Sequence, residues 1–304
     1  MFRVAHLSDL HATPARGGVP ALLGKRLLGW LSWRLRRHRV HGPEVLDALL
    51  ADLAREAPDQ VVVTGDLTNV AGEEEFPAAR EWLVRIGPPE RVSLVPGNHD
   101  AYVRVAKEQG VGLWRAWIES DPDAGARLPG VARDGYPTLR VRGPLAIVGL
   151  SSAVPTPIFL AQGEVGAAQR ERLESLLADL RRAGLFRLVL IHHPPEAGAV
   201  ARRRALRDAT ALGAVFARAG AELVVHGHLH RQRVGALAGP DGPIPVVCAR
   251  SASDVGLRPE RRSQYHVYEV EPASGEARGW RIRMRVRGYD PATGAFAAEG
   301  ERGL

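Results

Sequence analysis

The sequence has few of the features that mark secreted or membrane-spanning chains. It contains one cysteine, Cys248, so an intramolecular disulfide framework is excluded, and we expect a buried, unreactive thiol. No stretch reaches the roughly 18 uninterrupted apolar residues that a membrane span needs. The first residues, from Met1 to Asp9, lack the charged region, apolar core and cleavage site of a signal peptide. We therefore expect a cytoplasmic protein.

Lysine is also scarce, and arginine supplies nearly all of the positive charge. The 41 basic residues exceed the 34 acidic residues and give a formal net charge of +7. This charge favours an anionic partner, such as a phosphate, a nucleic acid or an acidic membrane surface, although compositional bias explains it equally well. No basic patch is interleaved with aromatic residues, as single-strand binding requires. A nuclease therefore ranks low, and we expect no specific nucleic-acid binding.

What the chain does contain is an ordinary globular composition and a regular alternation of short apolar runs with helical patterns. In the first two-thirds this alternation is typical of βαβ units with mostly parallel strands. From about Ile244 onward strands follow one another without helices, so we expect them to complete the sheet of an α/β domain. The expected strands are 2–7, 60–64, 91–95, 146–150, 187–191, 223–225, 245–249, 265–270 and 280–286, and the expected helices are 43–56, 73–86, 167–182 and 203–219.

Five of the expected strands are each followed directly by a polar cluster. Because ligands bind outside the carboxyl ends of the strands in parallel α/β sheets, we expect these clusters to meet at one edge. They offer His, Asp and Asn side chains and no thiolate, a set that suits Mn²⁺, Fe or Zn²⁺. The clusters are Ser8-Asp9-Leu10-His11, Gly65-Asp66-Leu67-Thr68-Asn69, Pro96-Gly97-Asn98-His99-Asp100, His192-His193-Pro194-Pro195 and His226-Gly227-His228-Leu229-His230.

The clusters hold more good ligands than one metal ion needs. Two metals that share a bridging carboxylate are therefore the economical interpretation. Two metals about 3.5–4 Å apart clamp the attacking and leaving oxygens of an in-line displacement and lower the pKa of a bridging water. Phosphoester hydrolysis by metal-activated hydroxide needs both effects. The seven expected ligands are Asp9, His11, Asp66, Asn98, His192, His228 and His230.

The ordered motifs resemble the calcineurin-like metallophosphoesterase family, whose pattern is D-x-H, G-D, G-N-H-D/E, a histidine after a strand, and G-H-x-H. This chain carries all five in that order, over about residues 1–270. Each motif alone is weak, whereas the ordered set is very specific. The resemblance implies a four-layer α/β/β/α sandwich of two packed mixed sheets. The resemblance extends to the bacterial cyclic-nucleotide phosphodiesterase branch, including Gly163-Glu164-Val165-Gly166 before the helix at 167–182.

The resemblance also implies a role for each residue. Asp66 would bridge the two metals. The first metal would be held by Asp9, His11 and His230, and the second by Asn98, His192 and His228. His99 would stabilise the transition state or protonate the leaving oxygen, and Asp100 would orient its ring.

Several polar residues near the motifs are expected to have lesser roles. Asn69 matches a position that supports the site in the family, and His193 is either a neighbour of His192 or a substrate contact. His6 and His226 are expected to be satisfied core histidines. No role is assigned to His38, His41 and His266.

An insertion of about residues 14–42 separates the first motif from the helix that begins at Pro43. Within residues 22–39, a helical wheel gathers one broad apolar arc and leaves most basic residues outside it. The segment is either a cap helix packed on the domain or an interfacial helix that contacts the inner face of the membrane. The arc consists of Leu23, Leu27, Leu28, Trp30, Leu31 and Leu35. A second basic cluster, Arg202–Arg204, either lines the same mouth or starts a solvated helix.

Three further expectations follow. The apolar pattern ends after Gly288, which predicts a domain over residues 1–288 and a loose tail over residues 289–304. The expected substrate is a small phosphorylated molecule, most simply a nucleotide-like phosphodiester, with a lipid-linked pyrophosphate of the UDP-diacylglucosamine type as the alternative. A metal-free binding scaffold of the same fold would lack ligands, and none of the seven is missing.

Overall fold

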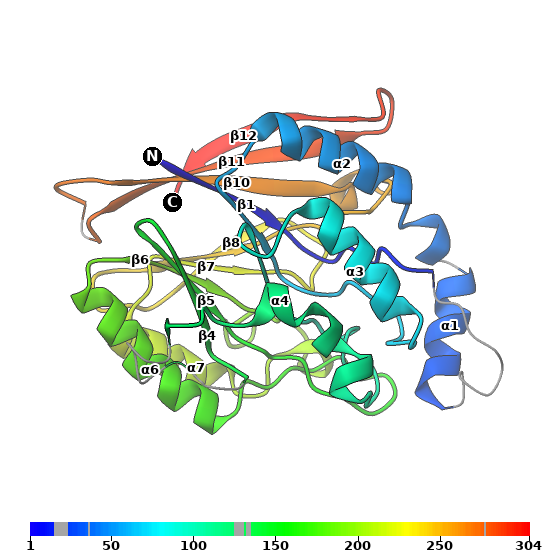
Figure 1. Cartoon of the computed structure of the whole chain (residues 1–304), viewed down its shortest axis with the longest axis horizontal. Coiled ribbons are helices and arrows are strands. Elements are labelled where there is room, and N and C mark those ends of the chain that lie inside the picture. Colours follow the sequence, from blue (N-terminus) through cyan, green and yellow to red (C-terminus); the bar gives the residue numbers. More distant parts are fainter. Residues whose placement is uncertain (15–23, 36, 125–130, 132–134, 277) are drawn as a thin grey trace.

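The computed structural model describes residues 1–14, 24–35, 37–124, 131, 135–276 and 278–304. In these residues the chain forms two six-stranded mixed sheets with helices on their outer faces, as Figure 1 shows. The four-layer α/β/β/α arrangement expected from the motifs is confirmed. No helix among the described residues is long and apolar enough to cross a membrane.

The first sheet has the strand order β12-β11-β10-β1-β2-β3. Its parallel half consists of β1 (Phe2–Leu7), β2 (Gln60–Val63) and β3 (Val92–Leu94). Its antiparallel half consists of β10 (Gln264–Pro272), β11 (Trp280–Asp290) and β12 (Ala295–Gly303). β10 pairs with β1, so the C-terminal strands complete the sheet as expected.

The second sheet has the order β4-β5-β6-β7-β9-β8. Its centre is parallel and consists of β5 (Leu145–Gly149), β6 (Phe186–Leu190), β7 (Leu223–His226) and β9 (Ile244–Cys248). The antiparallel edges are β4 (Thr138–Arg142) and β8 (Arg233–Leu237). The carboxyl ends of β1, β2, β3, β6 and β7 carry the polar clusters.

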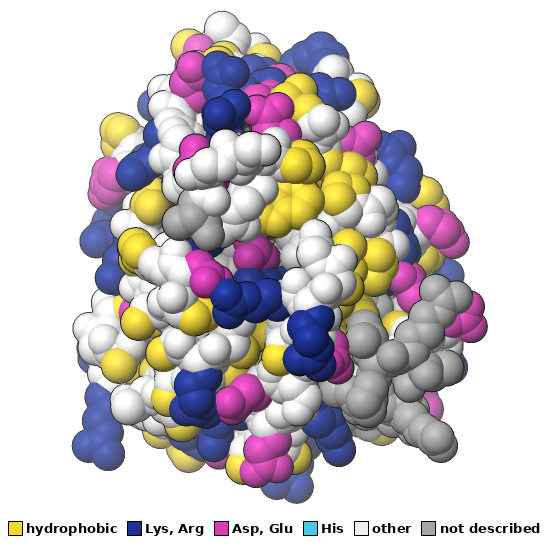
Figure 2. Space-filling model, turned by 90° about the vertical axis from the view of Figure 1, so that its left-hand side faces the viewer, with side chains coloured by type: hydrophobic (Ala, Val, Ile, Leu, Met, Phe, Trp, Pro, Cys, Tyr) yellow, Lys and Arg dark blue, Asp and Glu magenta, His cyan; other side chains and the backbone are white. Residues whose placement is uncertain are grey.

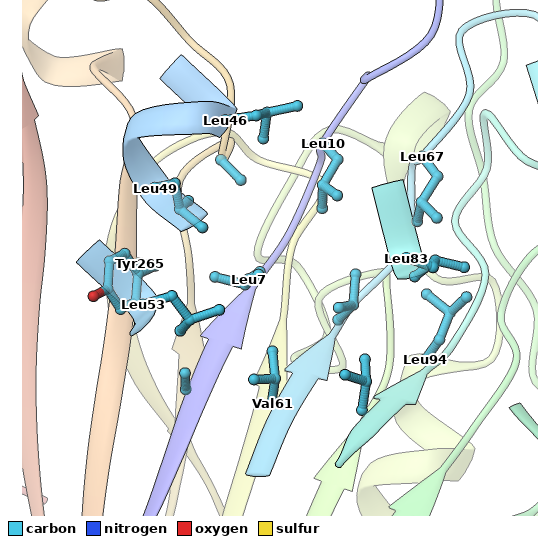
Figure 3. Close-up of a cluster of buried hydrophobic side chains, with 14 of the residues drawn as sticks. Leu7, Leu10, Leu46, Leu49, Leu53, Val61, Leu67, Leu83, Leu94 and Tyr265 are labelled. Atoms are coloured by element: carbon cyan, nitrogen blue, oxygen red, sulfur yellow. The ribbon is translucent and has the colours of Figure 1, made fainter. Parts of the chain in front are cut away.

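The outer layers follow from the spacing of apolar residues. In α2 (Pro43–Glu56), Pro43 occupies the first turn and the buried residues Val45, Leu46, Leu49 and Leu53 form one stripe. α2 and α3 (Glu75–Ile86) cover the first sheet, and Figure 3 shows their leucines packed on β1 to β3. α6 (Ala167–Arg182) and α7 (Ala209–Ala219) cover the second sheet.

Between the two sheets, alternate strand residues form a separate apolar layer. Val4 and Val62 point into this layer, while Ala5 and Val63 point to the helices, as the two-residue period of strands requires. The remaining short elements connect the layers. They are α1 (Lys25–Leu35), α4 (Arg115–Ile118) and 3₁₀ turns at Arg37–Arg39, Lys107–Gln109, Val111–Trp114, Arg202–Arg204 and Pro259–Arg261.

Two expectations about the elements are wrong. The predicted tail contains β12, which pairs along β11 and buries only Phe296 well. Its stability comes from backbone hydrogen bonds, which leave no apolar pattern in the sequence. The helix expected from residue 203 begins only at Ala209, because Arg202–Arg204 forms a separate turn. Residues 15–23 and 36 of the insertion, including Leu23, lie outside the described residues.

Candidate metal centre

The five polar clusters meet at one end of the two sheets, and backbone hydrogen bonds hold them together. The amide of Asp9 donates to the carbonyl of Gly65 at 2.9 Å, and the amide of His11 donates to the carbonyl of Asp66 at 2.9 Å. The amide of His228, after β7, donates to Asp9 Oδ2 at 3.0 Å. Clusters that are more than 200 residues apart in sequence are thereby tied to one another.

Backbone strain is concentrated in this centre. Among the described residues other than glycine, eight have a positive φ, and five of them belong to the expected ligand set. A left-handed backbone is costly for residues with a Cβ, and it persists where the surrounding structure enforces it, often at functional sites. The five residues are Asp9 (φ 50), His11 (φ 42), Asp66 (φ 56), His228 (φ 70) and His230 (φ 51).

The side chains of the expected ligands form two adjoining groups. In the first group, His230 Nε2 lies 3.1 Å from Asp9 Oδ1 and 3.4 Å from His11 Nε2. In the second group, Asn98 Oδ1 lies 3.1 Å from His192 Nε2 and 2.8 Å from His228 Nδ1.

Asp66 lies between these two groups. Its Oδ2 is 3.3 Å from His192 Nε2, and its carboxylate also lies within 4.8 Å of ligand atoms of His11 and His99. All seven expected ligands are therefore brought together, with Asp66 between the two groups.

Hydrogen bonds on the outer side set the protonation of three imidazoles. His192 Nδ1 donates to the carbonyl of Thr64 at 2.6 Å, and His11 Nδ1 donates to that of Thr68 at 3.1 Å. His228 is turned the other way, and its Nε2 donates to the carbonyl of Arg204 at 3.0 Å. Since a carbonyl only accepts, the outer nitrogen carries a proton in each ring, and the inner nitrogen is the one that presents a lone pair when the ring is neutral.

The carboxylates of the centre keep their negative charge although they are buried. Burial opposes ionisation of Asp66, but the neighbouring charges of His192, His99 and His11 hold its pKa well below the ordinary value. Burial likewise disfavours protonated His192, yet Asp66 and Asp9 raise its pKa to about 9. The negative charges of Asp66 and Asp9 therefore favour a cation in the centre.

The buried carboxylate of Asp9 indicates that this cation can be a metal ion. Asp9 Oδ2 accepts hydrogen bonds from Ser8 Oγ and from the amide of His228, whereas the buried Oδ1 makes no hydrogen bond of good geometry among the described residues and has His230 Nε2 beside it, at 3.1 Å. An unpartnered buried carboxylate oxygen is costly unless a cation meets it. Together with the inward lone pairs, it makes the donor set fit a divalent transition metal.

The glycines of the motifs are explained by close packing. A Cβ at Gly97 would overlap the carboxylate and amide of Asp66, and a Cβ at Gly227 would overlap Ser8 Oγ and Asp9 Oδ2. Both glycines thus allow the backbone to approach a carboxylate that faces the centre.

A cavity of about 590 Å³ opens over the centre. Its floor includes Asp66, Asn98, His99, His228 and His230. Its walls come from four segments, which are the end of the insertion and the segments between β5 and α6, between β6 and α7, and between β9 and β10. The wall residues are Leu35, Arg39, Val40, His41, Ala161, Arg204, Asp254, Leu257, Arg258 and Arg261.

A family model described as calcineurin-like phosphoesterase matches residues 2–232, which include every motif of the centre. The chain belongs to this family. Among the described residues, His and Asp side chains of the motifs form groups that could hold a metal ion.

Known proteins agree with this assignment to the calcineurin-like phosphoesterases. The chain is 38% identical over 103 residues to the glycerophosphodiester phosphodiesterase GpdQ of Enterobacter lignolyticus. That match covers 32% of this chain and 29% of the relative, so it spans less than a third of either protein.

Two solved structures share the fold. A dimetal phosphatase from Danio rerio matches with a TM-score of 0.60 and 14% identity, over 98% of both chains. A purple acid phosphatase from yellow lupin (Lupinus luteus) seeds matches with a TM-score of 0.55 and 13% identity, over 99% of this chain and 53% of that chain. At these identities the likeness concerns the fold.

Within this calcineurin-like centre, the role expected for Asp100 is wrong. Its carboxylate accepts hydrogen bonds from the amides of Asp66, Leu67, Thr68 and Gly97, so it clamps the loop that carries Asp66. The ring of His99 is held elsewhere, because its Nδ1 donates to the backbone carbonyl of Asn69. Asn69 therefore supports the site as expected, but through its main chain, while its side chain donates to the carbonyl of Thr13.

His193 is a buried neighbour of the centre. Its Nδ1 lies 2.8 Å from Ser152 Oγ, its Nε2 lies 3.3 Å from the carbonyl of Ala161, and its ring packs 4.5 Å from that of His228. Of the two roles expected for it, this geometry favours the neighbour. His6 and His226 are buried and hydrogen bonded, as expected of core histidines.

His41 is the site residue that the motifs did not reveal. Its ring centroid lies 4.6 Å from that of His11 and 5.9 Å from that of His230, and these three side chains form a group able to hold a metal. Ser253 Oγ lies 2.7 Å from its Nδ1. The only signal in the sequence was its place at the end of an insertion that begins beside the first motif.

Proposed function

We propose that this protein hydrolyses a phosphodiester with a nucleotide-like group, by the action of two metal ions held in the candidate centre. The observation that carries the proposal is the convergence of seven donor side chains whose inner atoms present lone pairs or negative charge. Two Mn, Fe or Zn ions bound there would supply Lewis acidity and a water of lowered pKa.

Each residue of the centre has a role in this proposed hydrolysis. Asp9, His11 and His230 would hold one ion, and Asn98, His192 and His228 would hold the other. Asp66 would be shared by both. His99 stabilises the charge that develops on the phosphoryl group or gives a proton to the leaving oxygen. Since its Nδ1 is committed to the carbonyl of Asn69, any proton it gives to the substrate comes from Nε2.

The diester class is supported by the partial similarity to a glycerophosphodiester phosphodiesterase. The cavity supports a group larger than phosphate, because its volume of about 590 Å³ lies in the range of small-molecule sites.

The direct test is hydrolysis of bis(p-nitrophenyl) phosphate and of a cyclic nucleotide by protein loaded with Mn²⁺ or Zn²⁺. We expect turnover that a chelator abolishes and added metal restores. A metal-loaded sample with no activity on any phosphoester would refute the proposal.

A second candidate substrate is a lipid-linked pyrophosphate of the UDP-diacylglucosamine type, at the surface of the membrane. The observation that favours it is α1, in which no described residue is buried. Its leucines Leu27, Leu28, Leu31 and Leu35 keep between 39% and 70% of their surface exposed, although Gly29 of the same helix packs against Val70 and Tyr102.

Two further segments continue this apolar surface. Lys25 Nζ donates to the carbonyl of Thr156 at 3.0 Å, which ties α1 to the loop that exposes Ile158 and Phe159, the latter 86% accessible. Leu257, 70% accessible, lines the same cavity as Leu35. We define the lipid-facing surface as Leu27, Leu28, Leu31, Leu35, Ile158, Phe159 and Leu257.

Figure 2 shows the side of the molecule away from α1, where acidic and basic side chains are interspersed around an apolar area in the upper middle of the view. An apolar surface beside an arginine-lined mouth suits the headgroup region of an anionic membrane.

A further inference from the structure

Four arginines line the cavity above the candidate metal centre. They come from three separate parts of the chain, which are the end of the insertion, the segment before α7 and the segment between β9 and β10. The four are Arg39, Arg204, Arg258 and Arg261. The fold thus collects positive charge at one place from residues that are up to 222 positions apart (261 − 39).

The cavity arginines differ in their partners from the buried, ion-paired arginines of the protein. Arg187 is paired with Glu222, and Arg287 with Asp52, as is common for buried guanidinium groups. Within the described part of the chain, none of the four cavity arginines has an ion pair with a carboxylate.

Only part of this charge is held by local contacts. Arg204 donates from its guanidinium to the carbonyl of His228 at 2.8 Å, next to the metal ligands, and the like charges of Arg261, Arg203 and Arg231 act on it. The Nε of Arg261 is buried without a hydrogen-bond partner. Asp254, the acidic residue in the same walls, accepts a hydrogen bond from the amide of Gly256 at 2.9 Å.

We propose that the cavity arginines form a subsite for a second anionic group of the substrate, namely a phosphate adjacent to the phosphate that is cleaved. This inference rests on the proposed function and specifies its substrate class as diphosphate esters. Guanidinium groups suit the role because they bind phosphate oxygens through paired N–H donors and stay charged at every physiological pH.

The shape of the site selects a small diphosphate over a nucleic-acid strand. The four arginines surround one cavity of about 590 Å³ and are not spread along a groove. A strand binder follows a chain of phosphates with a continuous basic track and stacking aromatic side chains. None of the described cavity residues is aromatic apart from histidines.

The experiment measures binding of UMP and UDP by calorimetry to the metal-loaded full-length protein, for the wild type and three variants. Arg258→Gln and Arg261→Gln remove cavity charge. Arg203→Gln is the control, because Arg203 is an exposed neighbour of Arg204 that does not line the cavity. All three variants lose one positive charge, so any difference between them reflects position.

We expect the wild type to bind UDP more tightly than UMP. Each cavity variant should weaken UDP binding about tenfold and UMP binding much less, as the loss of a charge-assisted hydrogen bond predicts. The control should keep the wild-type preference. Equal losses for both nucleotides, or no difference between cavity variants and control, would overturn the subsite. Arg258 is exposed, so its variant tests the idea even if Arg261→Gln fails to fold.

Binding and turnover separate the two proposals. A metal-loaded protein that prefers UDP but hydrolyses no phosphoester would refute the proposed function and support the subsite. A protein that hydrolyses bis(p-nitrophenyl) phosphate but shows no arginine-dependent preference for UDP would refute the subsite alone.

Discussion

Five residues of the expected ligand set adopt left-handed backbone conformations, each at a cost of order ~1–3 kcal/mol. The cost is offset by the network around them, in which Asp100 binds four backbone amides and motif glycines admit the carboxylates of Asp9 and Asp66. The strain turns side chains from five clusters towards one point.

His41 provides a prediction at the scale of one residue. Because its ring lies against His11 and His230, His41→Ala should weaken metal binding on that side about tenfold or more, as loss of groups around a metal does. The matched control is His38→Ala, an exposed histidine of the same insertion that contacts the carbonyl of Trp33. Titration of the metal-free protein with Zn²⁺ and a competing chelator measures both variants. Equal affinities in the two variants would refute the role of His41.

The sequence was informative about single residues where motifs exist. All seven expected ligands converge, since strand ends fix where those side chains lie. The partner of His99 was not predictable, because Asn69 holds it by a main-chain carbonyl that any residue could supply. His41 was missed because the pairing of its segment with Asp254 depends on tertiary structure.

At the scale of elements, the interior strands, the edge strand β3 and the long helices were predictable, and the other edge strands were not. α2 and α6 begin and end at the expected residues, because their buried stripes are regular. β4, β8 and β12 lie at sheet edges or carry many exposed residues. One face or both of such strands meets water, so their sequences lack the apolar signal by which β5 and β6 were recognised.

α1 provides the prediction at this scale. The double variant Leu28→Glu/Leu31→Glu places two charges on its exposed apolar arc. Burial of a leucine side chain contributes about 1.5–3 kcal/mol, so we expect binding to phosphatidylglycerol vesicles to fall at least about tenfold. The control is Val84→Glu, an exposed apolar residue on α3, which should bind as the wild type does.

Sedimentation with vesicles measures this binding. Vesicles of phosphatidylcholine, which lack net charge, separate the apolar from the electrostatic contribution. If the wild type binds neither kind of vesicle, or if the α1 variant binds like Val84→Glu, the lipid-facing surface has no membrane role. The nucleotide-like substrate would then be favoured over the lipid-linked pyrophosphate.

At the scale of the whole molecule, the centre depends on both sheets. Each sheet contributes strand ends to the same edge. β1, β2 and β3 belong to the first sheet, and β6 and β7 belong to the second. Neither sheet carries a complete ligand set. The architecture was predictable from the order of the motifs, whereas the cavity walls depend on loops that no short pattern describes.

The central claim is that Asp66 joins two metal sites. The most direct test is the metal content of purified Asp66→Ala, with Asp47→Ala, an exposed aspartate of α2, as the control. We predict about two transition-metal ions per chain in the wild type and the control, with loss of both metal and phosphodiesterase activity in Asp66→Ala. Retention of two ions together with activity in Asp66→Ala would contradict the account.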